Sequence, residues 1–201
     1  MQAEFSNQYH VPGQQDPIAT YENHCLRNPD CGLSAYREMG NDVTLQKNTI
    51  AGDILEREIL IQPHAGSVPG VLRTLAGDDA FDCVQYTRYD FATHIGTAET
   101  VLTGSFLKTK VKNKATFTIR CPNPDTPRTV SYDSACEINV NILFVGKKAE
   151  KSIIEEVSSR QPKIRSCNQT WLNNQFITDG EPESETATEV LSPVLEESTT
   201  I

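Results

Sequence analysis

The sequence lacks any run of about 20 apolar residues, the length that a helix needs to cross a lipid bilayer. It also lacks a basic start followed by an apolar run, which is the pattern of an export signal. We therefore expect no spanning helix and a soluble, cytoplasmic protein, in which cysteines stay reduced.

Motifs that carry catalytic or metal chemistry are missing as well. The sequence has no HExxH pair, no phosphate-binding glycine loop and no nucleophile motif, and its four histidines are dispersed. Its six cysteines include no CxxC pair, and Cys25 and Cys31, with His24, have no second ligand pair that would complete a tetrahedral zinc site. We expect no metal and no cofactor.

Positive charge is missing from the C-terminal end. Seven of the 27 acidic residues lie beyond Ile177, where there is no Lys or Arg, so the other 20 acids nearly balance the 18 bases. An acidic, Ser/Thr-rich segment cannot bury enough apolar surface to offset its ordering entropy. The sequence predicts one domain at residues 1–178 and an acidic, disordered tail at residues 179–201.

Residues 134–158 carry the clearest pattern in the chain. From Cys136 to Phe144 every second residue is apolar, and the residues between them begin as polar ones. This period of two is typical of a half-buried antiparallel strand. Gly146 interrupts the alternation, so the sequence predicts a long strand that stops at this glycine.

A long C-terminal helix follows. From Lys147 to Val157 the apolar residues recur at helical spacing among Lys and Glu, and a second apolar stripe contains Trp171. Pro162 lies between the two stripes, where it must kink or break the helix. We expect one kinked helix or two helices in line.

The rest of the chain supplies further strands and short helices. Asp16 before Pro17 is a good helix start, which predicts a short helix that ends near residues 28–29. Residues 30–40 are expected to form a loop with one helical turn, and residues 68–77 a short helix with a glycine cap. Strands are expected at residues 1–11, 43–47, 49–62, 81–91, 95–107 and 115–120.

The segment Leu55–Leu60 also fits a helix, but its β-branched residues and Pro63 favour a strand. One curved antiparallel sheet wrapped around the C-terminal helix, with two short helices after the first strand, buries every amphipathic face. The predicted fold class is α+β.

Two segments resemble a known superfamily. VPGVLRTLAGDDAFDCVQYTRYD (residues 68–90) and INVNILFVGKKAEKSIIEEV (residues 138–157) are similar to an uncharacterised family of the START-like helix-grip (SRPBCC) superfamily, which includes the birch-pollen-allergen-like proteins and polyketide cyclases. Gly146 and Glu150 match that family's glycine turn and glutamate, whereas Lys147 stands where a second glycine is expected. The resemblance implies an apolar cavity between sheet and helix that holds a lipid or another hydrophobic ligand.

The predicted ligand-binding residues lie on the apolar faces of the strands and helices that would enclose this cavity. They are Leu55, Arg57, Ile59, Leu72, Phe117, Ile119, Ile138, Val140, Ile142, Ile153, Val157 and Trp171. Arg57 falls on the apolar face of its strand, so it needs either a protein carboxylate or an anionic ligand group.

Four alternate lysines predict a basic hairpin tip, with all four side chains on one side: Lys108, Lys110, Lys112 and Lys114. Lys147, Lys148 and Lys151 form a second basic cluster near the helix start. Such a patch is suited to peripheral contact with an anionic membrane, although lysines also protect ordinary edge strands. Without interleaved aromatic residues, we expect no nucleic-acid binding.

The functional hypothesis is therefore non-covalent binding, and transfer as an extension of it, of a lipid or other hydrophobic ligand by a monomer. One alternative is an enzyme of the cyclase/dehydratase kind, for which Arg57, Tyr86 and Tyr89 are the candidate polar groups. The other is a protein-interaction module with a filled core.

Overall fold

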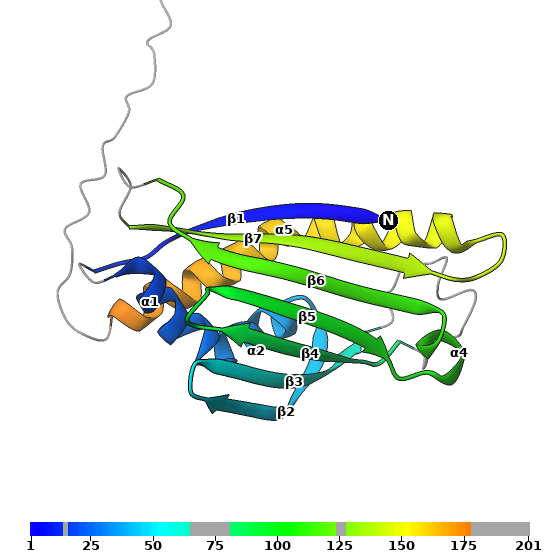
Figure 1. Ribbon diagram of the computed structural model, residues 1–201, viewed down its shortest axis with the longest axis horizontal. Coiled ribbons are helices and arrows are strands. Elements are labelled where there is room, and N and C mark those ends of the chain that lie inside the picture. The colour runs from blue at the N-terminus through cyan, green and yellow to red at the C-terminus, as the bar shows by residue number, and fades with distance from the viewer. Residues whose placement is uncertain (14–15, 65–80, 124–127, 178–201) are drawn as a thin grey trace, which may run out of the picture.

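A computed structural model describes residues 1–13, 16–64, 81–123 and 128–177. Seven antiparallel strands form one curved sheet in the order β1–β7–β6–β5–β4–β3–β2 (Figure 1). The strands are β1 (Gln2–His10), β2 (Asn41–Ala51), β3 (Ile54–Pro63), β4 (Cys83–Asp90), β5 (Ile95–Leu102), β6 (Val111–Arg120) and β7 (Thr129–Val140). The sequence-predicted α+β helix-grip architecture is confirmed.

Helices cover one face of this sheet. They are α1 (Pro17–Tyr21), the π-helix η1 (Glu22–Leu26), α2 (Pro29–Glu38), α4 (Ser105–Lys108) and the long α5 (Gly146–Ile177). α5 packs against β1, β7 and α2, and its two halves run in different directions around Pro162 (Figure 1). The helix is therefore continuous and bent, because a proline inside a helix removes one backbone hydrogen bond.

The short helices begin at capping residues that the sequence makes visible. The Asp16 carboxylate accepts hydrogen bonds from the amides of Ile18 and Ala19, which confirms the predicted helix start. Asn28 caps α2 in the same way, so the prediction that residues 30–40 form a loop is wrong. The helix forms because Asn28 and Pro29 repeat the cap signal of the preceding helix.

Two strand boundaries differ from the prediction. The single strand expected at residues 49–62 is two strands, because Gly52 adopts φ +58° and turns the chain between β2 and β3. The expectation of a strand rather than a helix at Leu55–Leu60 is confirmed. The strand expected at residues 95–107 ends at Leu102, and α4 follows it.

The central strand–helix connection turns earlier than predicted. β7 ends at Val140, so the expected strand positions Ile142 and Phe144 lie in a turn instead. The Gly146 amide donates to the Ile142 carbonyl at 2.9 Å. A Cβ at Gly146 would lie 2.3 Å from the Val140 carbonyl oxygen, so only glycine lets α5 start this close to the strand end.

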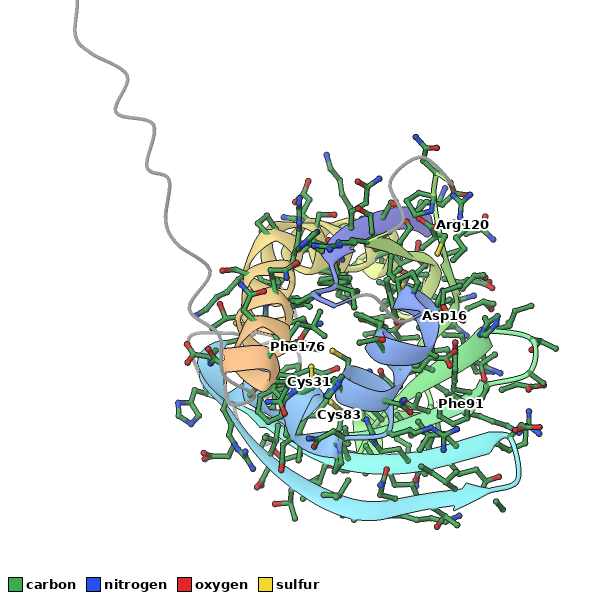
Figure 2. All side chains as sticks on the ribbon, turned by 90° about the vertical axis from the view of Figure 1, so that its left-hand side faces the viewer. Asp16, Cys31, Cys83, Phe91, Arg120 and Phe176 are labelled. Carbon is green, nitrogen blue, oxygen red and sulfur yellow. The ribbon has the colours of Figure 1, made fainter. Side chains whose placement is uncertain are left out.

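Some predictions lie outside the described residues. They are the helix at residues 68–77, with Leu72, and the acidic tail at residues 179–201. Figure 2 looks along the sheet from one end and shows Cys31 of α2 and Cys83 of β4 inside the space that the sheet and helices surround. Arg120 lies on the outside. All six cysteines are free.

Candidate functional site

The inner face of the sheet is packed tightly near both ends. At one end lies an aromatic-rich cluster of buried residues, which includes Tyr9, Tyr21, Leu55, Tyr89, Phe91, Phe117, Ile119, Val130 and Leu172. At the other end lies a mainly aliphatic cluster, which includes Leu107, Val111, Ile138, Val140 and Ala149. These two clusters leave the stretch of the inner face between them as the least buried part of that face.

A stack of rings forms the wall of the aromatic-rich cluster. The Phe117 ring lies 5.6 Å from the Tyr89 ring and 5.0 Å from the Tyr132 ring, in stacked geometry. Gly96 makes room for this stack, since a Cβ there would lie 2.2 Å from the Phe117 Cζ atom. The Tyr132 hydroxyl has no hydrogen-bond partner in the described part of the chain, and burial raises its pKa.

Between the two clusters the inner face carries small and polar side chains. Strand register places them in two neighbouring rows, Thr87–Ala98–Ala115 and Gln85–Thr100–Asn113. We call these six residues the polar band. Every one of them is half-buried, although they lie on the face that α2 and α5 cover. The middle of the inner face is therefore less completely buried than its two ends.

Hydrogen bonds occupy only part of the polar band. The Tyr36 hydroxyl of α2 donates to the Gln85 side-chain oxygen at 3.0 Å, and the Cys136 thiol donates to the Asn113 side-chain oxygen at 3.2 Å. Within the described residues, the hydroxyls of Thr87 and Thr100 have no partner. The band thus offers neutral donors and acceptors to a bound molecule.

The helix opposite the band is packed in the same uneven way. Ala149 and Leu172 of α5 are fully buried, whereas every described residue between them is half-buried or exposed. Ile153 and Val157 belong to this middle part. The middle of α5 is therefore less completely buried than its two ends, as the middle of the sheet's inner face is.

The predicted site residues are distributed over these regions. Leu55, Phe117, Ile119 and Trp171 belong to the aromatic-rich cluster, and Ile138, Val140, Ile142 and Ile153 belong to the aliphatic one. Ile59 joins a third cluster with Leu33, Ile61 and Cys83. The sequence thus identified the apolar ends of the inner face. It missed the polar band, whose residues resemble outward-facing ones until strand register is known.

Arg57 is buried as predicted, with 6% of its surface exposed, but its partners differ from those expected. Its Nε donates to the Asn48 side-chain oxygen at 2.9 Å, and its Nη2 donates to the Leu26 carbonyl. Neither acceptor is acidic, and burial lowers the pKa of the guanidinium. Arg57 ties β3 to β2 and to the end of η1.

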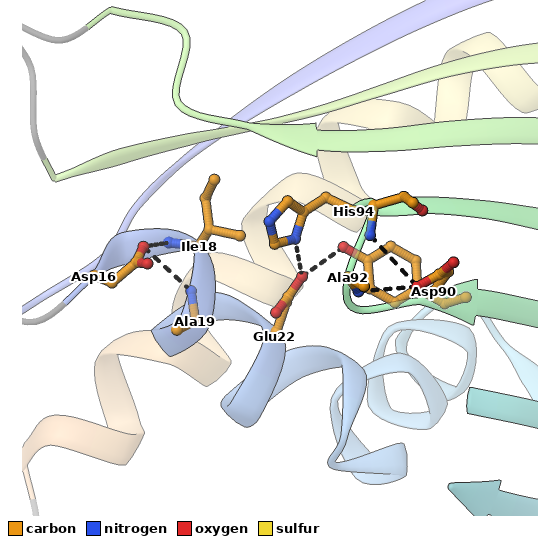
Figure 3. A network of polar contacts seen from close by, with 9 residues as sticks. Asp16, Ile18, Ala19, Glu22, Asp90, Ala92 and His94 are labelled. Carbon is orange, nitrogen blue, oxygen red and sulfur yellow. Dashed lines mark hydrogen bonds and ion pairs between the residues drawn. The ribbon is translucent and has the colours of Figure 1, made fainter. Parts of the chain in front are cut away.

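A buried carboxylate closes the end of the aromatic-rich cluster (Figure 3). Glu22 of η1 accepts a hydrogen bond from the Tyr89 hydroxyl at 2.6 Å, and it lies 2.7 Å from Nδ1 of His94. Burial and the neighbouring carboxylate raise the pKa of Tyr89. Tyr89 is fully buried, and its hydrogen bond to Glu22 anchors η1 to β4.

The buried Cys25 thiol is held in its protonated form, which is a poor nucleophile. A hydrogen bond with Cys31 is the main cause that raises the pKa of the Cys25 thiol, and burial is the second. The thiol therefore stays protonated. In the part of the chain that the structure describes, no three His, Cys, Asp or Glu side chains are placed to hold a metal ion.

A separate groove of about 440 Å³ lies on the outer face of the sheet. Its charged walls include the ion pairs Lys47–Glu56, at 2.9 Å, and Lys114–Glu99, at 3.6 Å. These partners satisfy one another at the surface. Thr87, Ala98 and Ala115, one row of the polar band, also border this groove, because the groove lies over the strands that carry them. Their side chains alternate with the outward-facing Tyr86, Arg88 and Thr116 and so point to the other face of the sheet.

The predicted lysine hairpin is wrong in its geometry. Lys108 ends α4, Lys110 lies in the turn after it, and only Lys112 and Lys114 share the outer face of β6. The four lysines therefore do not lie on one side of an extended segment. Among the described helices, none is long and apolar enough to cross a membrane.

No protein-family model matches the sequence, and no curated protein matches it. Solved structures do match. The protein TTHA0849 from Thermus thermophilus is similar with a TM-score of 0.56 and 6% identity, over 88% of this chain and 99% of that chain. Dicamba monooxygenase bound to 3,6-dichlorosalicylic acid has a TM-score of 0.56 and 9% identity, over 96% of this chain and 54% of that chain.

This chain therefore spans about half of the dicamba monooxygenase chain that it matches. At such low identities the likeness concerns the fold alone. Together with the sheet order and the long C-terminal helix, it shows that the chain has the START-like helix-grip fold that the sequence resemblance predicted.

Proposed function

We propose that this protein binds a hydrophobic small molecule non-covalently between the polar band and the middle of α5. The observation that carries the proposal is the half-buried state of the band between two fully packed clusters. Ligand sites in proteins are typically concave and mostly apolar, with a few polar groups that orient the bound molecule. The two clusters supply the apolar walls, and the band supplies the polar groups.

The chemistry of the band indicates which ligands fit. Its six residues are neutral. The hydroxyls of Thr87 and Thr100, and that of Tyr132 in the neighbouring aromatic stack, have no partner among the described residues, and each can both donate and accept a hydrogen bond. Such a wall favours an uncharged or weakly polar head on an apolar body, as in a sterol, a fatty alcohol or an aromatic compound. Dicamba monooxygenase, similar in fold, has been solved with a small aromatic acid bound.

Binding is favoured over catalysis for a specific reason. A general acid or base must reach the reacting atoms of the substrate, yet no residue of the polar band is an acid or a histidine. Glu22 and Tyr89 form a hydrogen bond with each other at the far end of the aromatic-rich cluster. The Arg57 guanidinium already donates hydrogen bonds to the Asn48 side chain and to the Leu26 carbonyl. We therefore place transport or storage of the ligand ahead of its conversion.

The direct test is to purify the full chain under native conditions, extract it with organic solvent, and identify the extracted molecules by mass spectrometry. We expect one class of apolar molecule at a near-stoichiometric amount. A folded sample that yields no such molecule, and that binds no apolar fluorescent dye, would refute the proposal and favour an interaction module with a filled core.

A further inference from the structure

Two large apolar side chains protrude into solvent in the turn between β7 and α5. Leu143 is 78% exposed and Phe144 is 95% exposed, the two highest values among the exposed large hydrophobic residues that the structure describes. We call this pair the apolar tip. An isolated exposed apolar side chain is ordinary, but two adjacent ones at the end of a loop indicate a contact with another apolar phase.

The backbone holds the apolar tip outward. Phe144 has φ +64°, a left-handed conformation that is uncommon for a bulky residue. On one side the Asn141 amide donates to the Lys110 carbonyl at 2.7 Å, and on the other the Gly146 amide donates to the Ile142 carbonyl at 2.9 Å. Strained residues of this kind persist where surrounding bonds determine them, often at functional positions.

Lysines lie on both chain segments next to the apolar tip. Lys147 and Lys148 lie in the first turn of α5, which contains no acidic residue. Lys108 ends α4, and the carbonyl of Lys110, in the turn after it, accepts the Asn141 amide. We call these four residues the basic collar. Cations at a helix N-terminus are repelled by the helix dipole, so this arrangement is complementary to an external anionic surface.

The acidic residue nearest to the collar in sequence is already engaged. The Glu150 carboxylate accepts the Val140 amide at 2.9 Å and lies 3.6 Å from the N-terminal amine of Met1. Its partners are thus a strand amide and the N-terminal amine rather than a lysine of the collar. Figure 1 shows α4 and the turn that precedes α5 at the same end of the molecule.

We propose that this end of the molecule docks on an anionic lipid bilayer, with the apolar tip at headgroup depth and the basic collar against lipid phosphates. A protruding two-residue tip suits a fluid surface that deforms around it, whereas a protein partner of ordinary affinity buries a broad patch of roughly 800 Å². Exposed aromatic residues flanked by lysines are the pattern of peripheral membrane contact.

The proposal revises the sequence prediction and does not depend on ligand binding. Lys108 and Lys110 belong to the collar, while Lys112 and Lys114 lie on the outer face of β6 and do not. Docking would bring the aliphatic end of the inner face to the bilayer, because Ile142, next to the tip, packs against that cluster.

Vesicle co-sedimentation of the full chain tests the proposal. Vesicles that mix phosphatidylcholine with phosphatidylserine should bind the protein, pure phosphatidylcholine vesicles should bind it far less, and high salt should release it. The double variant Leu143→Ser/Phe144→Ser should lose about tenfold in affinity, and so should Lys147→Glu/Lys148→Glu.

Matched controls are available on the same molecule. Ile95→Ser removes an exposed apolar side chain elsewhere on the molecule. Lys112→Glu/Lys114→Glu reverses the charge at two exposed positions outside the collar. Both variants should bind the vesicles as the unmodified chain does. Circular dichroism confirms that each variant is folded. Absence of binding to the anionic vesicles, or equal losses in tip and control variants, overturns the proposal; capture of a protein at the tip without vesicle binding does so too.

Discussion

Phe117 of β6 lies flat against the backbone of Gly96 on the neighbouring strand, at a position where any side chain would collide with its ring. The contact lets Phe117 stack between Tyr89 and Tyr132. This relationship fixes the wall that bounds one end of the proposed ligand site.

Gly96→Ala should therefore destabilise the fold by about 2 kcal/mol or more, because the added methyl group overpacks a rigid aromatic stack. Urea unfolding gives the free energy of unfolding. Gly32→Ala is the matched control, since nothing lies within 4 Å of its new Cβ. Alanine inside α2 should stabilise the protein by up to about 1 kcal/mol. Equal stability of both variants would contradict the role given to Gly96.

Glu22 and Tyr89 should be coupled energetically. Glu22→Gln weakens the hydrogen bond, and Tyr89→Phe removes it, so each change should cost about 1–3 kcal/mol of unfolding free energy. In a double-mutant cycle the two losses should not add, with a coupling of about 1–2 kcal/mol. Additive losses would show that the 2.6 Å contact contributes little to stability.

Alkaline pH should destabilise the protein through its buried tyrosines. Burial raises the pKa of Tyr9 to about 12 and that of Tyr36 to about 12, and it raises the pKa values of Tyr21, Tyr89 and Tyr132 as well. The unfolded tyrosine ionises near pH ~10. Below that pH the stabilisation is complete, and above it the unfolded state loses protons first, so stability falls as pH rises.

The expected slope is at most about 1.4 kcal/mol per pH unit for each buried tyrosine. Urea unfolding between about pH 9 and 11 measures it, with absorbance of the phenolate as a second signal. Tyr132→Phe should lower the slope, because it removes one titrating group without removing a hydrogen bond in the described residues. Phenolate absorbance in a protein that stays fully stable would contradict this account.

Glu150 should stabilise the junction of β7 and α5. Its carboxylate accepts the Val140 amide, so Glu150→Ala should cost about 1–2 kcal/mol, and Glu150→Gln should cost less because an amide oxygen can still accept that bond. Glu155→Ala is the control, since the Lys151–Glu155 pair is exposed and its loss should cost under about 0.5 kcal/mol. A smaller effect at Glu150 than at Glu155 would refute this assignment.

The sequence predicts the sheet better than the site, and particular residues explain why. Alternation of apolar and polar residues places Leu55 and Ile59 of β3, and Ile138 of β7, on the inner face, as the structure confirms. The same alternation hides the turn at Gly52, because apolar residues continue on both sides of it. It also extends β7 too far, since Phe144 continues the pattern while pointing into solvent.

The polar band could not be found from sequence alone. Thr87, Thr100 and Asn113 look like outward-facing strand residues, and only the pairing of β4, β5 and β6 brings them together. Pairing register depends on contacts far apart in the chain, which a single sequence does not specify. The Glu22 network was missed for the same reason, because Glu22 and His94 are distant in sequence and meet only in the folded protein.

The most direct measurement of the central claim compares two neighbouring residues of β6. Ala115 faces the proposed ligand site and Thr116 faces outward, so the same substitution to phenylalanine fills the site in one case and adds surface in the other. Binding of an apolar fluorescent dye would be titrated for both variants after urea unfolding shows that each is folded. We predict that Ala115→Phe weakens binding by about tenfold or more, while Thr116→Phe leaves it unchanged. Equal binding by both folded variants would contradict a ligand site on the inner face of the sheet.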